Sequence, residues 1–113
     1  MTAARPVRGA EKHPLLIDLP TEGFRSASTL YRSRPLAATV TPLLTGQLEG
    51  ATQGEPVAWL NTHHNGRVFY TSLGSPDDFK TPAFRRLLLN GVLWGLDRPI
   101  PPEPRVAAAA AQQ

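Results

Sequence analysis

The sequence predicts an α/β fold in which a β-hairpin is followed by a helix, and three local patterns support this prediction. Two runs rich in β-branched and aromatic residues flank Asn65-Gly66, a dipeptide typical of tight hairpin turns. The second run stops at Gly74-Ser75-Pro76, and a helical pattern of apolar residues begins after Thr81-Pro82. In α/β folds the turn between a strand and the following helix is a common place for a ligand site.

Length and composition set the broad class. The chain has 113 residues, 41% of them hydrophobic, so one domain with a modest core is expected. It has no cysteine, which excludes disulfides, thiolate metal ligands and a cysteine nucleophile within the chain. The formal charge is +3, but the arginines are scattered among acids and match no nucleic-acid-binding motif, so no nucleic-acid partner is expected. No apolar run approaches the ~20 residues of a membrane-spanning helix and no secretory signal is visible, so a soluble chain, cytoplasmic by default, is expected.

The first third of the chain gives weak signals. Residues 1–12 are polar and contain a proline and a glycine, which predicts a flexible lead-in. A short apolar run follows at 15–17, and residues 21–28 are predicted to be irregular. Leu30 and Tyr31 are apolar anchors in a segment where a short strand is expected.

One strand is predicted before the hairpin. Residues 38–44 fit a strand, and Pro42 predicts that this strand lies at an edge or carries a bulge, because proline has no amide donor. Residues 45–54 contain three glycines and predict a polar loop.

The predicted hairpin determines which side chains share a face. A two-residue turn at Asn65-Gly66 pairs His64 with Arg67 and Trp59 with Ser72. Alternation then places Val57, Trp59, Asn61, Val68 and Tyr70 on one face and Leu60, Phe69, Thr71 and Leu73 on the other. Both faces carry large apolar groups, so the hairpin is expected to be buried on both sides near its base.

A helix is predicted over residues 83–96. Thr81 can cap its start, and Pro82 is tolerated at the first helical position. Its apolar stripe is broad, as expected for a helix wedged between a sheet and another element. Prolines after residue 97 end the helix, and residues 102–113 are expected to be a disordered Pro/Ala-rich tail. One helix cannot cover both faces of a sheet, so the chain is expected to be part of a larger domain.

Several short motifs resemble the trehalose-utilisation (ThuA-like) family. The most specific is Gly-Arg-Val-Phe-Tyr-Thr-Ser-Leu-Gly, from Gly66 to Gly74. The others, in chain order, are His13-Pro14-Leu15-Leu16, Leu30-Tyr31, Pro56-Val57-Ala58-Trp59, Phe79 and Asn90-Gly91-Val92-Leu93-Trp94. Their order resembles the C-terminal half of the family's domain, over about residues 13–101. The resemblance implies part of a flavodoxin-like α/β fold, similar to class I glutamine amidotransferase domains, and a link to the metabolism of trehalose or related sugars.

The sequence departs from the family pattern in three ways. Family members usually have Gly-His where this chain has Gly74-Ser75, and an acidic residue where it has Thr29. The parallel strands and glycine-rich turn of the family's N-terminal half are not found. In the amidotransferase relatives, a histidine after the corresponding strand is the base for a cysteine. This chain offers neither residue, so amidotransferase chemistry is not expected.

Four residues are candidates for a site. His13 matches the family's His-Pro position and is the candidate catalytic group, as an acid/base or hydrogen-bonding imidazole, while the alternative is a turn residue bonded to the backbone. Tyr31 matches the family's tyrosine and could bind a sugar, unless it is simply buried. Ser75 is predicted to line the substrate site, because no Gly-x-Ser-x-Gly elbow marks it as a nucleophile. Asp77, beside Asp78, could accept sugar hydroxyls, while the alternative is a helix-start position.

Two other polar features have simpler explanations. His63 and His64 are adjacent, so they are expected to point to opposite faces near a solvated hairpin tip. No metal site and no cofactor are therefore expected. Arg67 is expected to cap the hairpin or to pair with an acid rather than to bind substrate.

The resulting hypothesis is a ThuA-like domain that binds or acts on a sugar-type small molecule around Ser75 to Asp78. The alternative is a non-catalytic ligand-binding or interaction module that keeps only the fold. An enzyme should place His13, Tyr31 and Asp77 in one concave pocket, whereas a module could leave them apart and expose an apolar patch on the helix or the hairpin. A bare half-domain would also expose part of its sheet, so a homo-oligomer is an expected state.

Overall fold

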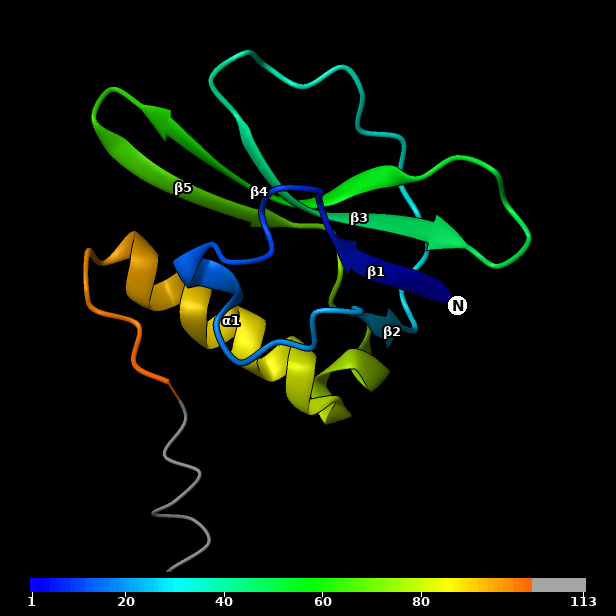
Figure 1. The fold of residues 1–113 in the computed structure, drawn as a ribbon. Coiled ribbons are helices and arrows are strands. Elements are labelled where there is room, and N and C mark those ends of the chain that lie inside the picture. The colour runs from blue at the N-terminus through cyan, green and yellow to red at the C-terminus, as the bar shows by residue number, and fades with distance from the viewer. Residues whose placement is uncertain (103–113) are drawn as a thin grey trace, which may run out of the picture.

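The computed structural model describes residues 1–102, in which α1 (Pro82–Gly95) lies across one face of a five-stranded sheet (Figure 1). The strands are β1 (Thr2–Pro6), β2 (Phe24–Ser26), β3 (Thr41–Leu48), β4 (Glu55–His63) and β5 (Gly66–Thr71). Two 3-10 helices are present, η1 (Pro14–Leu16) and η2 (Pro76–Lys80). The strand order is β2-β1-β3-β4-β5, and every neighbouring pair is antiparallel. The predicted α/β class, with a hairpin followed by a helix, is therefore confirmed.

The N-terminal segment forms an interior strand, and the predicted flexible lead-in over residues 1–12 is wrong. β1 pairs with β2 on one side and with β3 on the other, so Thr2 lies between Ser26 and Leu48. Thr2 and Ala4 are both 0% exposed. The segment is short and carries no strong strand pattern of its own. Its distant partners in the sheet decide its conformation, as is common for strands.

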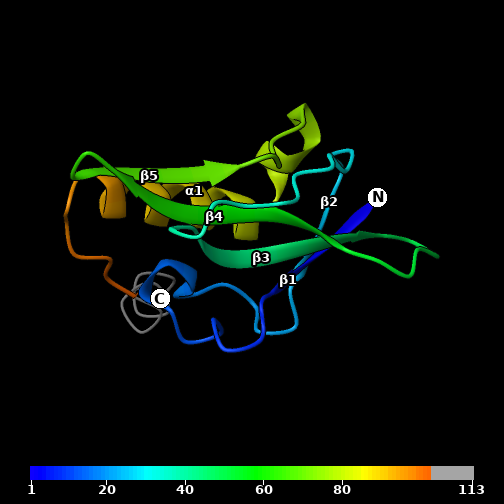
Figure 2. The same ribbon diagram turned by 90° about the horizontal axis from the view of Figure 1, so that it is seen from above.

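The next strands also differ from the prediction. The strand expected at Leu30-Tyr31 does not form. β2 lies earlier, within residues that were predicted to be irregular, and residues 27–40 form the connection from β2 to β3. β3 starts and ends later than the predicted segment 38–44, and it extends into residues predicted to form a loop. Register shifts against β4 follow Pro42, so the predicted bulge is confirmed. The curling of the sheet across β3 is visible from above (Figure 2).

The β4–β5 hairpin turns at His64-Asn65 rather than at Asn65-Gly66. His63 pairs with Gly66, and the central residues His64 and Asn65 have φ angles of 49° and 65°. A type I′ turn needs left-handed angles at both central positions, and asparagine adopts them more readily than most residues. The asparagine therefore takes the second central position, and the glycine becomes the first residue of β5.

The change of turn shifts the strand register by two residues. Trp59 lies opposite Tyr70, with ring centroids 3.9 Å apart, so the predicted pairing of Trp59 with Ser72 is wrong. A shift of two leaves every side chain on its predicted face, because side chains alternate with a period of two. Val57 and Ala58 are adjacent on β4 and face opposite ways, and both are 0% exposed. Burial on both sides near the hairpin base is therefore confirmed.

α1 packs against β5 and η1. Gly91 lies against the Phe69 ring, so closely that a Cβ atom there would be 2.4 Å from a ring carbon. The buried Asn90 donates from Nδ2 to the carbonyl oxygens of Leu15 and Ile17, at 2.9 and 3.0 Å. These two hydrogen bonds hold η1 on the helix beneath the sheet.

Part of the α1 stripe stays exposed. Leu89, Val92 and Leu96 are 47%, 58% and 65% exposed, so within residues 1–102 no second element covers that side. The width of the apolar stripe predicted a helix wedged between the sheet and another element. Within the described residues, this side of the helix is instead exposed to solvent. The tail predicted from residue 102 lies, from 103 onward, outside the described residues.

Candidate functional site

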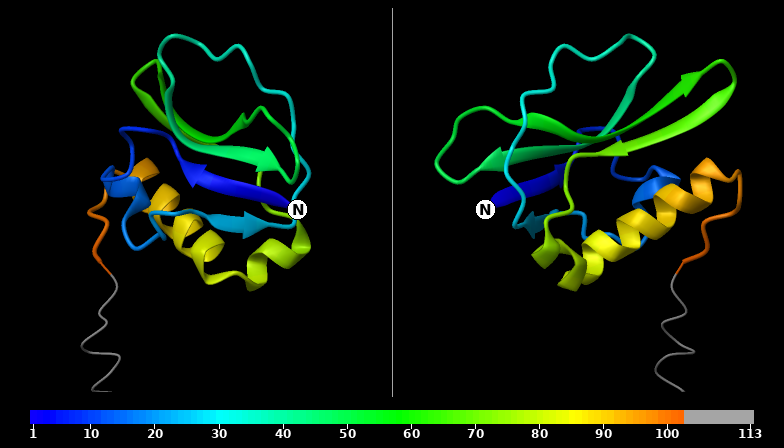
Figure 3. Two further views of the ribbon diagram at one scale, coloured as in Figure 1. Left: turned by 45° about the vertical axis from the view of Figure 1, so that its right-hand side comes forward. Right: turned by 180° about the vertical axis from the view of Figure 1, so that it is seen from behind.

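The loop after β5 is organised around one buried carboxylate, that of Asp78 in η2. The residue is only 1% exposed. Its Oδ2 atom accepts hydrogen bonds from the hydroxyls of Ser26 and Ser28, both at 2.6 Å. The backbone amide of Gly74 donates to Oδ2 at 2.9 Å, and the amide of Ala27 donates to Oδ1 at 2.7 Å. The carboxylate therefore joins the end of β2 to η2, which lie side by side in both views of Figure 3.

The four donors keep the Asp78 carboxylate ionised. Burial by itself raises the pKa of a carboxyl group. Hydrogen bonds from the two serines and the two backbone amides outweigh burial, so the pKa of Asp78 lies below its ordinary value of 3.8. Because the protein already occupies its acceptor positions, this carboxylate has little capacity to bind a sugar hydroxyl or to take a proton from a substrate. Its role is structural.

Ser75 and Asp77, two of the predicted substrate-binding residues, lie next to the Asp78 hydrogen bonds in the chain but make different contacts. The Ser75 amide donates to Ser28 Oγ at 3.1 Å, and the Ser75 hydroxyl is buried with no hydrogen-bond partner within residues 1–102. No imidazole or carboxylate activates that hydroxyl, as a serine nucleophile would require. Asp77 points outward with its side chain 73% exposed, and it pairs with Lys80 at 3.4 Å.

The sequence analysis selected Asp77 as a candidate, whereas Asp78 is the member of the pair that the fold buries. Ser75 is the N-cap of η2, and Asp78 stands three residues later. This Ser-x-x-Asp spacing is the signature of a capping box, whose acidic residue turns back toward the helix start. That signal, applied to this segment, would have selected Asp78. It could not have revealed the partners on β2, which lie far away in the chain.

His13 and Tyr31 are also used differently from the hypothesis. His13 caps η1, and its Nδ1 atom accepts a hydrogen bond from the Leu15 amide at 3.1 Å. Burial lowers the pKa of His13 below 6.5, which keeps the imidazole neutral and able to accept that bond. This matches the alternative of a turn residue bonded to the backbone. Tyr31 is 59% exposed on the connection between β2 and β3, so the alternative of a buried tyrosine is wrong.

The structure does not bring the four candidates together. η1, which follows His13, is bonded to the middle of α1 through Asn90, whereas η2 precedes the first residue of α1. Figure 1 shows η1 and η2 toward opposite ends of the helix. Neither of the two pockets described below is lined by any of the four residues.

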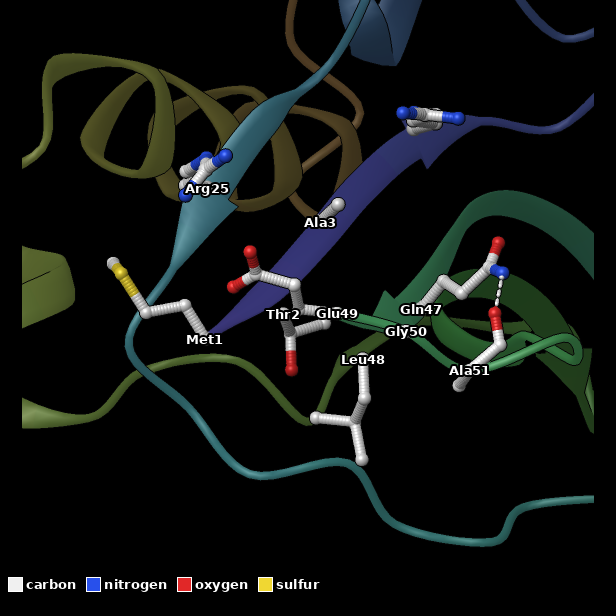
Figure 4. Close-up of a pocket in the computed structure, with 10 residues that line it drawn as sticks. Met1, Thr2, Ala3, Arg25, Gln47, Leu48, Glu49, Gly50 and Ala51 are labelled. Carbon is white, nitrogen blue, oxygen red and sulfur yellow. Dashed lines mark hydrogen bonds between the residues drawn. The ribbon is translucent and has the colours of Figure 1, made fainter.

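A pocket of about 240 Å³ lies instead over β1, β2 and the end of β3 (Figure 4). Ala3 pairs with Arg25 and with Gln47, so these residues share one face. The polar side chains that line the pocket are Arg5, Arg25, Gln47 and Glu49. Gln47 donates through its amide to the carbonyl oxygen of Ala51, and this bond shapes the turn that closes one side. A second pocket of about 180 Å³ adjoins the same two arginines.

No sequence pattern indicated this pocket. Its central strand, β1, was predicted to be flexible, and its lining residues come from three separate segments. Only the pairing of β1 with both neighbours places the two arginines together.

The histidines at the hairpin tip do not behave as predicted. His64 lies in the turn rather than in a strand, and its ring meets the His63 ring edge to face, with centroids 4.2 Å apart. The two side chains are thus neighbours and do not point to opposite faces. Among residues 1–102, no group of three His, Asp or Glu side chains is arranged to hold a metal ion. No helix in that range is long and apolar enough to span a membrane.

A family model described as ThuA, trehalose utilisation, matches residues 2–95. The chain belongs to the ThuA family. Comparison with curated proteins and with solved structures found no match. The match begins at β1 and ends at the last residue of α1, so it covers the whole sheet and the helix packed on it.

Ser75 and Thr29, the two positions that depart from the expected pattern, lie in the same part of the fold. The Ser75 amide is bonded to Ser28. Thr29 follows Ser28 directly and is exposed.

Arg67 behaves as predicted by pairing with an acid. Its guanidinium lies 3.4 Å from the Asp97 carboxylate and donates to the Trp94 carbonyl oxygen at 2.9 Å. It also lies over the Trp94 ring, 4.6 Å from the centroid. These contacts hold the C-terminal end of α1 against β5.

Proposed function

We propose that this ThuA-family chain is a non-catalytic module of carbohydrate metabolism that binds a sugar-type small molecule in the pocket over β1, β2 and β3. The single observation behind the proposal is the composition of that pocket. It combines guanidinium and amide donors with amide and carboxylate acceptors, from Arg5, Arg25, Gln47 and Glu49, in a concave space of about 240 Å³. Sugars present many hydroxyl groups that both donate and accept, so planar polar side chains of this kind suit them.

The arrangement of the remaining candidates supports binding rather than catalysis. The His13 lone pair is occupied by the Leu15 amide, and the Asp78 carboxylate is occupied by four donors. The Ser75 hydroxyl has no base beside it within the described residues. Covalent or acid–base catalysis needs a reacting group within hydrogen-bond reach of a proton acceptor or donor.

The finer assignment of the fold is likewise a proposal. The described sheet is antiparallel throughout, whereas a flavodoxin-like domain is built on parallel strands. We infer that residues 13–101, together with β1, correspond to an antiparallel C-terminal portion of such a domain. The resemblance of the motifs to the second half of the ThuA domain supports this assignment.

Binding of glucose and trehalose to the full chain, followed by NMR, tests the proposed function. Amide signals of Ala3, Gly50 and Ala51 should shift on titration, because they border the pocket. Replacing Gln47 with alanine should weaken binding roughly tenfold, the effect of one or two hydrogen bonds. Gln53→Ala is the matched control, since Gln53 is exposed and does not line the pocket. Shifts confined to residues 72–78, or no shift with either sugar, would contradict the proposal.

A second candidate, self-association, is favoured by the outer side of the hairpin and helix. β5 is the last strand of the sheet, so its outer edge carries unpaired backbone groups within the described structure. Beside it, α1 exposes Leu89, Val92 and Leu96. The edge of a strand can pair in antiparallel fashion with the same edge of a second copy. A two-fold axis would then pair β5 with β5 of the second copy and cover the exposed apolar stripe of α1 on each copy.

Sedimentation of the wild type and of Val92→Lys tests self-association. The wild type should sediment as a dimer at micromolar concentration, and the variant should be monomeric with its fold intact by circular dichroism. Arg85→Lys, an exposed position on the same helix, should leave the dimer unchanged. A monomeric wild type would contradict this candidate without affecting the proposed sugar binding.

A further inference from the structure

The pocket over β1, β2 and β3 contains two arginines that form no ion pair within the described residues, although Glu49 lines the same pocket and Glu22 the adjoining one. Within residues 1–102, no carboxylate oxygen lies within 4.0 Å of the guanidinium of Arg5 or Arg25. Neither guanidinium donates a hydrogen bond to another described group. By contrast, Arg34, Arg67, Arg85 and Arg86 each have an acid or a carbonyl partner. The pocket therefore has unused charged donors.

The strand register brings these two side chains onto the same face. Arg25 is opposite Ala3, and Arg5 lies two residues further along β1, so the arginines form a diagonal pair across β1 and β2. Such diagonal neighbours are close enough for long side chains to reach one ligand.

A glycine makes room for the pair. Gly23 comes directly before β2, and a Cβ atom there would lie 2.9 Å from Arg5 Cγ and 2.1 Å from the Ala4 carbonyl oxygen. Its φ angle of 94° is also one that other residues rarely adopt. The absent side chain lets Arg5 extend along the sheet beside Arg25, where both side chains border the two adjoining pockets.

We propose that Arg5 and Arg25 bind the phosphate group of a phosphorylated monosaccharide. This inference rests on the proposed function for its sugar part and on the arginine pair for its phosphate part. Guanidinium groups recognise phosphate through paired N–H donors, and two of them match the charge of a phosphomonoester, which is about −1.5 to −2 at pH 7. Gln47 and Glu49 also line the pocket and offer oxygen acceptors for the sugar hydroxyls.

The size of the pocket favours one sugar ring over two. Its volume of about 240 Å³ lies below the ~300–1,000 Å³ common for drug-sized ligands. Glu49 carries a negative charge, which makes the site unsuitable for a bare anion and favours a ligand that offers hydroxyl donors as well as phosphate.

Calorimetric titration of the full chain with glucose 6-phosphate, glucose and inorganic phosphate tests this inference. We expect glucose 6-phosphate to bind at least roughly tenfold more tightly than glucose or inorganic phosphate, because charge-assisted hydrogen bonds add to the hydroxyl contacts. Its binding should weaken as salt is raised, since both guanidiniums are exposed to solvent.

Arg5→Gln and Arg25→Gln should each lower the affinity for glucose 6-phosphate roughly tenfold or more, and should lower the affinity for glucose by a clearly smaller factor, because only the phosphate forms charge-assisted hydrogen bonds with these side chains. Arg8→Gln removes the same charge from an exposed turn residue outside both pockets and should have little effect. Arg25→Lys provides a second variant that keeps the charge but loses the planar pair of donors, and it should bind with intermediate affinity.

The outcomes separate the two proposals. Equal binding of glucose and glucose 6-phosphate would overturn the phosphate inference alone. Equal binding of inorganic phosphate and glucose 6-phosphate would overturn the inference and also contradict sugar binding. An equal loss of affinity in Arg8→Gln and Arg25→Gln would overturn it as well, because general charge rather than the pocket would then explain binding.

Discussion

Replacing Asp78 with alanine is expected to lower the free energy of unfolding by about 3 kcal/mol or more, measured by urea denaturation. The substitution would leave two hydroxyl donors and two backbone amides, from Ser26, Ser28, Ala27 and Gly74, without their acceptor. Each buried donor that loses its partner costs about 1–3 kcal/mol, partly recovered where water can enter.

The neighbouring aspartate is the matched control. Asp77→Ala removes the same side chain from the exposed surface, where its pair with Lys80 has little value. Its effect should be within about 0.5 kcal/mol. Similar losses in both variants would show that the hydrogen bonds around Asp78 do not stabilise the fold.

The Asp78 carboxylate should make the free energy of unfolding depend on pH in the acidic range. Its pKa is below 3.8 in the folded chain, so the unfolded chain binds the proton more readily. The stabilisation is complete above pH 3.8 and is lost as the pH falls through the folded pKa. In Asp78→Asn this acid-dependent loss should disappear, although the variant is less stable at neutral pH.

Replacing Gly91 with alanine is expected to destabilise the fold by about 1–3 kcal/mol, although alanine is the better helix former. The new Cβ atom would lie 2.4 to 2.9 Å from three carbons of the Phe69 ring. The Phe69 ring lies between α1 and β5, so it would have to shift to make room for the new atom.

Gly95→Ala gives the opposite expectation. It lies in the last turn of the same helix, and a Cβ atom there meets nothing within 4 Å. Alanine should therefore be neutral or stabilise the helix by up to about 1 kcal/mol. Thermal unfolding of both variants under the same conditions tests the contrast. A stabilised Gly91→Ala variant would mean that α1 does not pack on β5 in this register.

The features that depend on neighbouring residues could be predicted from local sequence patterns. Thr81-Pro82 and the apolar period located α1, and Asn65 marked the hairpin to within one residue, because caps, proline and left-handed angles act locally. The alternation within β4 and β5 assigned the faces correctly even though the register was wrong.

The other features depend on contacts between segments that are far apart in the chain. β1 is a strand because β2 and β3 hydrogen-bond to it from distant parts of the chain. Asp78 is buried, and Asp77 is not, because β2 and the loop after it supply the hydroxyls of Ser26 and Ser28 to one side of η2. Arg5 and Arg25 share a pocket because β1 pairs with β2. A local pattern records the conformation that a segment prefers, whereas a site requires contacts between segments, and those are set by the pairing and burial of the whole sheet.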